Sequence, residues 1–332
     1  MAKRKRLAVL ISGQLVRLQT PQLDSLAALL PFDTGVHLVV ARTVYTRAGS
    51  SAAIDTLPAL CSLDDGPLEA ALVAMLRAKG FARATADVLR ASVLDERMAR
   101  VDAAVAAANP KLWDATATLR RRVIHGNVQR WVHNGRMLYL RHLAYTAALE
   151  AAGSAPYDLI LCLREDNAFV HPDRPLPTEV DLLTRRAHSS RTHPRHHGRV
   201  LLDSHCGFLG APSDKVSVSD ASGARALLGA NGTEHIDLLL RWLRFGLERA
   251  NARNADPLQS EAFLVHQLKA RHVAVRHVAF ARTDVRMERP GVACVRPLYY
   301  ACGPEELRSR RLFPMCAPTS KHERELHEKY GE

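Results

Sequence analysis

The stretch Leu-Ile-Leu-Cys-Leu at residues 159–163 runs directly into Arg164, Glu165 and Asp166. A short, wholly apolar run of this kind indicates a buried strand of a parallel sheet. The charged residues then fall at its carboxyl end, where open α/β sheets bind their ligands. An acidic side chain there can hold a divalent metal, and an arginine can hold a phosphate. The alternative is a strand that leaves the core into an ordinary polar turn.

Other apolar runs extend this strand into a sheet. Residues 7–11 and 36–40 read as buried strands, and the leucines of residues 21–30 recur at helical spacing between them. This order predicts a βαβ unit and therefore a parallel sheet near the N-terminus. A long helix is expected over about 128–152, because apolar residues recur along it and Gly153 follows as a stop signal.

We expect one α/β domain over residues 1–332, with a mostly parallel, Rossmann-like sheet flanked by helices. Apolar runs at 199–202 and 273–280 predict two further strands. Residues 50–122 are rich in Ala, Leu and Arg with no convincing strand, so they predict a helical insertion. Residues 290–332 predict an irregular, charged tail that contains one short helix.

The charge of the chain favours anionic partners but not nucleic acid in particular. The sequence has 332 residues, is 47% hydrophobic and carries a formal net charge of +12 with His neutral. Such a charge favours phosphate-bearing or polyanionic partners. Because the arginines are scattered and no basic segment is interleaved with aromatic residues, a nucleic-acid module is not indicated. No apolar stretch has the length of a membrane span, so we expect a cytoplasmic protein, or a soluble lumenal one if an anchor has been removed.

The cysteines show no metal-binding or redox motif. There are six, and none forms a C-x-x-C pair. We expect free thiols, with a buried, reduced thiol for Cys162 inside its predicted strand. The alternative is a disulfide within the tail, where Cys294, Cys302 and Cys316 lie. Residues 231–233, Asn-Gly-Thr, form a glycosylation sequon that matters only for a secreted chain.

Five motifs in this order resemble those of glycosyltransferase-like proteins with a GT-A-type fold. The resemblance covers residues 7–48 and about 125–286 and leaves out the segment 50–122. The motifs are Ser12-Gly13-Gln14 after the first strand, Gln129-Arg130-Trp131 at the start of the long helix, the Tyr-Asp entry and Arg-Glu-Asp end of residues 157–166, Asp214-Lys215, and Ser260-Glu261 with Leu264 three residues later.

The resemblance implies transfer of a sugar from a nucleotide-sugar donor to an acceptor that it does not identify. GT-A enzymes usually hold Mn²⁺ or Mg²⁺ with an Asp-x-Asp motif, and the metal offsets the charge of the departing diphosphate. Asp166 is the first metal and catalytic candidate, and Glu165 is the lesser one. The sequence departs from the motif because Arg164 stands at its first acidic position. Arg164 is therefore a candidate diphosphate contact, and metal dependence becomes an open question.

The resemblance also suggests roles for residues elsewhere in the chain. Ser12, Gly13 and Gln14 would border the nucleotide, although a plain strand-ending turn explains them as well. Lys215 is a candidate phosphate or acceptor contact and Asp203 a candidate donor-sugar contact. Glu261 could act as the catalytic base or bind the acceptor hydroxyl. A carboxylate in the first turn of a helix is also favourable without any chemistry.

Three other hypotheses remain. Another phosphate-handling enzyme, such as a sulfo- or nucleotidyltransferase, is possible in principle, although the sequence has no Gly-rich P-loop. A basic protein that binds nucleic acid or acidic polysaccharide would use the scattered cations and bind with a steep salt dependence. A catalytically inactive GT-A-like protein would explain the arginine at the motif's first position.

Overall fold

The computed structural model describes most of the chain. The described residues are 6–15, 18, 20–27, 33–42, 64–124, 128–165, 167–169, 198–203, 213–250, 257–278, 280, 282–289, 292–303, 305, 308 and 313–330.

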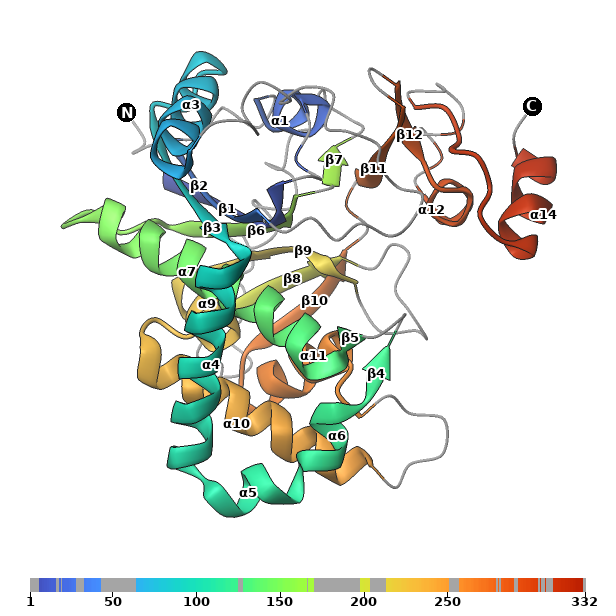
Figure 1. The fold of residues 1–332 in the computed structure, drawn as a ribbon. Coiled ribbons are helices and arrows are strands. Elements are labelled where there is room, and N and C mark those ends of the chain that lie inside the picture. The colour runs from blue at the N-terminus through green and yellow to red at the C-terminus, as the bar shows by residue number, and fades with distance from the viewer. Residues whose placement is uncertain are drawn as a thin grey trace, which may run out of the picture.

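A seven-stranded sheet forms the centre of the molecule, in the order β10-β8-β9-β6-β1-β2-β3 (Figure 1). Six strands run in the same direction, because β9 alone pairs antiparallel with both of its neighbours. The prediction of a mostly parallel α/β sheet flanked by helices is therefore confirmed. The strands are β1 (Arg6–Gln14), β2 (Asp33–Arg42), β3 (Arg83–Arg90), β6 (Leu159–Arg164), β8 (Arg199–Asp203), β9 (Ser213–Ser219) and β10 (Ala274–Val278).

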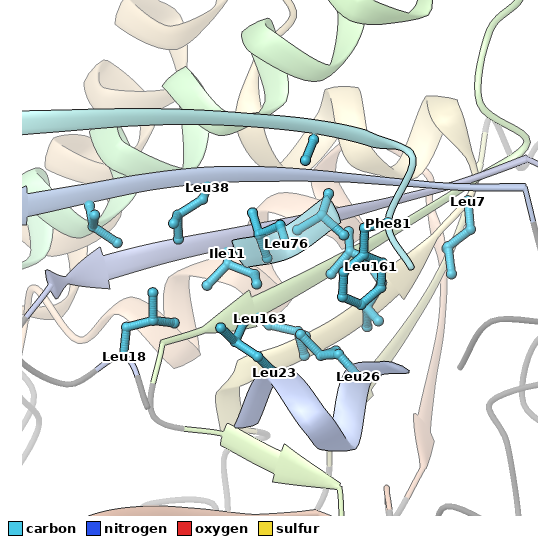
Figure 2. Packing of buried hydrophobic residues seen from close by; sticks show 14 of the residues in the cluster. Leu7, Ile11, Leu18, Leu23, Leu26, Leu38, Leu76, Phe81, Leu161 and Leu163 are labelled. Atoms are coloured by element: carbon cyan, nitrogen blue, oxygen red, sulfur yellow. The ribbon is translucent and has the colours of Figure 1, made fainter. Parts of the chain in front are cut away.

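Helices cover both faces of this sheet. Strand β1 shows the division, because Leu7, Val9 and Ile11 point into one apolar cluster while Ala8 and Leu10 point into another. Figure 2 shows the first cluster, in which the leucines of α1 and Leu76 of α3 pack against β1 and β6. The helices that bound the sheet are α1 (Thr20–Ala27), α3 (Asp65–Ala78), α4 (Ala91–Ala108), α7 (Arg130–Ala152), α9 (Ala221–Leu228) and α11 (Ser260–Ala270). Helix α10 (Gly232–Arg249) packs against α4, α7 and α11 instead.

Helix α7 connects the sheet to a second helical layer. It ends at Gly153, whose φ of +56° suits glycine, as the sequence predicts. Trp131 at its start is buried, stacks on Trp242 of α10 at 4.9 Å between ring centroids, and donates to Asp102 of α4. Two short helices, α5 (Pro110–Ala115) and α6 (Ala117–Arg121), complete this layer (Figure 1). A two-stranded ribbon of β4 (Val123–Ile124) and β5 (Val128–Gln129) leads into α7.

The segment 50–122 is not wholly helical, which corrects the sequence prediction. Residues 50–63 lie outside the described part. After them α3 leads to β3, which pairs with β2 over eight residues and forms an edge of the main sheet. Part of the expected insertion is therefore an integral strand of the sheet. The sequence of β3, Arg-Ala-Thr-Ala-Asp-Val-Leu-Arg, has too few large apolar side chains to read as a buried strand.

The tail contains more regular structure than the sequence predicts. Strands β11 (Arg282–Arg289) and β12 (Val292–Val295) form a three-stranded sheet with β7 (Asn167–Phe169). Two helices follow, α12 (Pro297–Cys302) and the predicted charged helix, α14 (Lys321–Tyr330). In Figure 1, β11 and β12 lie beside β7, and α12 and α14 lie farther from the main sheet, at the opposite end of the molecule from α5 and α6.

The tail cysteines form disulfides, so the expectation of free thiols is wrong for them. Cys294 of β12 is bonded to Cys316, with 5.0 Å between their Cα atoms. Cys302 is disulfide-bonded as well. Cys162 is free and buried, as predicted. In the described part of the chain no helix is both long and apolar enough to cross a membrane.

Candidate functional site

The carboxyl ends of β1 and β6 lie side by side, at the place where the strand order changes direction. Strands β2 and β3 continue the sheet on one side of β1, and β6 lies on the other. Ser12 is in register with Arg164, and the Glu165 N–H donates to the Ser12 carbonyl at 3.3 Å. A switch of this kind leaves a crevice between neighbouring strand ends, which is the usual ligand site of open α/β sheets.

Gly13 allows Glu165 to lie against the end of β1. Its φ is +148°, a conformation that glycine adopts far more readily than other residues. A Cβ at position 13 would overlap the Glu165 carboxylate. Glu165 itself is 2% exposed. The two motifs that the sequence singled out therefore contact each other, and the small residue in the first is what allows the contact.

A cavity of about 70 Å³ lies at these strand ends. Ser12, Gly13 and Gln14 line it from β1, and Arg164 and Glu165 line it from β6. Side chains from α7, α4 and β2 close the other sides. Because one water needs roughly 10–15 Å³ of such volume, the cavity has room for several waters or for a group of phosphate size.

Helix α7 contributes basic side chains that the motifs do not include. His133, Arg136 and Arg141 line the cavity, together with Met137 and Leu140. Their spacing of three and four residues places them on one side of the helix. Neither arginine was among the residues predicted from the sequence. A stripe of basic residues on the helix that precedes the charged strand end could have indicated them.

The charges that line this cavity, called here the arginine-lined cavity, suit an anion. Three arginines face a single carboxylate, Glu165, among the described lining residues. Arg136 also donates to Asp95 of α4, whose side chain is 53% exposed. Guanidinium groups bind phosphate oxygens with charge-assisted, often bidentate hydrogen bonds. The cavity therefore has the size and the charge to bind a phosphate group.

A second set of charges lies next to the cavity and is closed off from solvent. This buried ion cluster consists of Asp203 at the end of β8, Lys215 of β9, and Arg282 and Asp284 of β11, with Asn167 of β7. Arg282 donates to Asp203, to Asp284 at 2.5 Å and to Asn167 at 2.8 Å. Lys215 donates to Asp284, and its ammonium lies 3.8 Å from the centre of the Tyr299 ring.

Arg164 joins the two sets. It lines the arginine-lined cavity, and its Nη2 lies 3.4 Å from Asp284 Oδ2 in the buried ion cluster. Asp284 is 1% exposed and accepts from Arg164, Lys215 and Arg282. The buried Asp284 carboxylate thus holds Arg164 in position on the side away from the cavity.

The structure brings together only part of the predicted site. Ser12, Gly13, Gln14, Arg164 and Glu165 share the arginine-lined cavity. Lys215 and Asp203 do not line it; both are buried in ion pairs.

Two further predicted residues stand apart from the cavity. Glu261 occupies the first turn of α11, where it accepts from Ser260 Oγ at 3.2 Å, and it does not line the cavity. Asp166, the first metal and catalytic candidate, lies outside the described residues.

The described residues include only some of the side chains that could bind a metal. Within them no three His, Cys, Asp or Glu side chains are grouped closely enough to hold a metal ion. Glu165 is the candidate ligand at the cavity, whereas Asp203 and Asp284 are committed to Arg282 and Lys215. The described donors therefore do not make up a metal site by themselves.

Comparisons with known proteins give only distant likenesses. No protein-family model matches the sequence, and no curated protein matches it. Mouse xyloside xylosyltransferase 1 is 10% identical, with a TM-score of 0.36 and 82% of this chain and 84% of that chain covered. The glycosyltransferase GlyE of Streptococcus pneumoniae is 10% identical with the same TM-score; the match covers 82% of this chain and only 45% of GlyE.

A candidate glucose-1-phosphate thymidylyltransferase of Bacillus anthracis is also similar, at 8% identity and a TM-score of 0.34, with 84% of this chain and 89% of that chain covered. At these TM-scores the likenesses carry no argument about the activity of this chain.

Proposed function

We propose that this chain is a glycosyltransferase that uses a nucleoside-diphosphate sugar. The observation that carries the proposal is the convergence of two strand-end motifs on one cavity. The Ser-Gly-Gln sequence is the end of β1 itself and not the predicted turn. Its Ser12 pairs in register with Arg164 at the end of β6, and both strand ends line a space that three arginines surround. The switch-point geometry, the cavity size and its charge suit one phosphate group of such a donor.

In this sugar transfer, the main requirement is to neutralise the negative charge of the departing diphosphate. The bond between the anomeric carbon and the diphosphate oxygen breaks, a bond to the acceptor oxygen forms, and the diphosphate leaves with additional negative charge. Arg164, Arg136 and Arg141 would stabilise that charge as it develops, because fixed cations at a site with little water cost no reorganisation during the reaction. Ser12 and the backbone of Gly13 and Gln14 would border the nucleotide.

The remaining residues have proposed roles of different kinds. Asp166 with Glu165 would hold Mn²⁺ or Mg²⁺, which would supply further positive charge to the diphosphate when bound. Lys215 and Asp203 would act through the buried ion cluster, by holding Arg282 and Asp284 in place behind Arg164. Glu261 would serve as the base or bind the acceptor hydroxyl if substrate binding brings the acceptor to α11.

The test is donor binding and donor hydrolysis with purified protein. UDP- and GDP-sugars are offered with Mn²⁺ and with a chelator, and a CMP-sugar is offered beside them as a monophosphate donor for comparison. Thermal shift and sugar release are measured for wild type, Asp166→Ala and Arg141→Met. Arg100→Gln is the matched control, because its pair with Glu96 lies on the surface of α4. We expect a donor response in wild type and the control, and a loss in Arg141→Met.

The possible outcomes separate the competing hypotheses. No response to any donor would rule out the glycosyltransferase. A response that is indifferent to Mn²⁺ and to Asp166→Ala would remove the metal from the proposal and leave the arginines. Salt-sensitive binding of RNA or DNA without any donor response would instead establish a basic binding protein.

A further inference from the structure

We infer that this protein matures in an oxidising, glycosylating compartment and carries an N-linked glycan on Asn231. The inference does not depend on the proposed function. It rests on two independent features, the disulfides of the tail and the exposed Asn-Gly-Thr sequence before α10.

The backbone around the disulfide supports the pairing of the two cysteines. Val295, next to Cys294, forms a bridge with Met315, next to Cys316. The Val295 N–H donates to the Pro314 carbonyl, and the Cys316 N–H donates to the Val295 carbonyl, both at 2.9 Å. Cys294 is 0% exposed and Cys316 is 8% exposed. The two thiols are therefore held together inside the tail by its own fold, and do not meet by chance on a mobile surface.

The disulfides indicate the compartment. Disulfides persist in oxidising environments and are rare where glutathione and thioredoxin keep thiols reduced. In the tail, Cys294, Cys316 and Cys302 are all oxidised, whereas Cys162 in the central sheet is a free, buried thiol. Oxidation is thus found where two cysteines can meet, as expected for a chain that folds under oxidising conditions.

The sequon is displayed in a way that leaves the reactive atom available. Asn231, Gly232 and Thr233 are all exposed. Asn231 is the N-cap of α10, and its Oδ1 accepts from the Glu234 N–H at 3.0 Å. An N-glycosidic bond forms at Nδ2 and keeps Oδ1, so the glycan and the helix cap are compatible.

The surroundings of the sequon have room for a glycan and hold it in a fixed place. A Cβ added to Gly232 would meet no atom within 4 Å. Glu234 accepts from the Ala230 N–H at 2.9 Å and pairs with Arg225, which fixes the turn in front of the helix. None of the residues that line the arginine-lined cavity comes from this turn. A glycan here therefore leaves the cavity open.

The modification is a transfer with a defined co-reactant. The donor is an oligosaccharide joined to a lipid diphosphate, which the transferase of the compartment supplies. The bond between the Asn231 Nδ2 and the first sugar carbon forms, the bond from that carbon to the lipid diphosphate breaks, and the amide proton goes to a base of the transferase. The sequence contains no other Asn-x-Ser/Thr sequon, so the test concerns a single site.

The experiment produces the full chain behind a secretion signal in a host that performs N-glycosylation. We expect an intact mass above that of the polypeptide, and removal of the excess by peptide-N-glycosidase with aspartate left at position 231. Thr233→Ala and Asn231→Asp should both lose the glycan, although each retains an N-cap acceptor at position 231. Thr233→Ser should keep it. A secreted wild-type chain with an unmodified Asn231 would overturn the inference.

A second measurement tests the compartment in the cells that make the protein naturally. The cells are lysed in denaturant, so that buried thiols become accessible, the thiols are alkylated before and after reduction, and the peptides are identified by mass spectrometry. We expect Cys294 and Cys316 to be alkylated only after reduction. Alkylation of both without reduction would show a reducing compartment and would overturn the inference, whatever the heterologous host can do.

Discussion

The arginine-lined cavity and the buried ion cluster lie at the same edge of the sheet and share Arg164, yet they use charge in opposite ways. In the cavity, three arginines surround a space that is large enough for a phosphate. In the cluster, Asp203 and Asp284 are in direct contact with Arg282 and Lys215, and the side chains are almost fully buried. The first arrangement leaves a space that a ligand can enter, whereas in the second the charged side chains are packed directly against one another. A charged motif at a strand end therefore does not by itself identify a residue that contacts a ligand.

The largest expected effect comes from breaking the buried ion cluster. Asp284→Asn keeps the shape but leaves Arg282 and Lys215 buried with insufficient negative charge, so the free energy of unfolding should fall by about 3–5 kcal/mol. Chemical denaturation measures it. The control is Asp237→Asn, whose pairs with Arg241 and Arg271 are exposed and should contribute less than about 1 kcal/mol. Equal losses of unfolding free energy for the two substitutions would show that solvent reaches the buried ion cluster.

Acid should destabilise the protein through histidines that belong to neither set of charges. Burial lowers the pKa of His37 to about 4 and that of His235 to about 3, from the ordinary histidine value of 6.5. Between the lowered folded pKa values and pH 6.5, the unfolded chain binds more protons than the folded chain. The full free energy of unfolding is therefore present above about pH 6.5, and it decreases as the pH falls through this range. For His37 alone the loss approaches about 3 kcal/mol near pH 4.

The histidine contribution can be isolated with one variant. His235 stacks on His142 at 4.4 Å between ring centroids, and His235→Phe keeps a ring there but removes the titration. Between pH 6 and pH 5 the unfolding free energy of wild type should fall by about 1.4 kcal/mol per pH unit more than that of the variant. Equal slopes in denaturation series at several pH values would contradict the assignment.

A smaller effect on stability is expected at the edge of the cavity. Gly13→Ala places a Cβ against the Glu165 carboxylate at a φ that alanine adopts poorly, and should cost about 1–3 kcal/mol. It should also reduce the thermal shift produced by a donor, because Glu165 must move. Gly66→Ala on α3 is the control, since nothing lies within 4 Å of its added Cβ. The control should be neutral or stabilising, and a tolerated Gly13→Ala would show that the two motifs are not in contact.

The smallest effect on stability, with a clear effect on binding, is expected for Arg136→Gln. Its pair with Asp95 is partly exposed, so the unfolding free energy should change by less than about 1 kcal/mol. If Arg136 contacts phosphate, the loss of one charged hydrogen bond of about 1.5–3 kcal/mol should weaken nucleoside-diphosphate binding about tenfold or more. Calorimetric titration of the variant beside Arg100→Gln decides this. Unchanged affinity would place the ligand elsewhere.

Strands that are buried among apolar residues on both faces could be predicted from the sequence. Residues 7–11, 36–40 and 159–163 are strands in the structure because only a buried strand accommodates such short apolar runs. Strand β3 could not be predicted in this way, because alanine, threonine and charged side chains alternate in it and pairing with β2 decides the structure. Edge strands of this kind depend on their partner more than on their own composition.

The candidate site was predicted in its motifs but not in its partners. Ser12, Gly13, Gln14, Arg164 and Glu165 could be placed together because parallel strands end at one edge. Arg136 and Arg141 could not, because their role depends on how α7 is rotated against β1 and β2. The disulfide between Cys294 and Cys316 likewise depends on the pairing of β12 with a later segment, which spacing along the chain does not reveal.

The pairing of β1 with β6 has a consequence for how the protein folds. β1 pairs with β2 from Arg6 to Asp33, whereas its pairing with β6 joins residues as far apart as Arg6 and Asp158, at a separation of 152. Closing the longer loop costs on the order of 1.5 kcal/mol more in chain entropy than closing the shorter one. A β1-β2 unit can therefore form first. The register of Ser12 with Arg164 is absent until β6 docks, so the site is assembled in the later steps of folding.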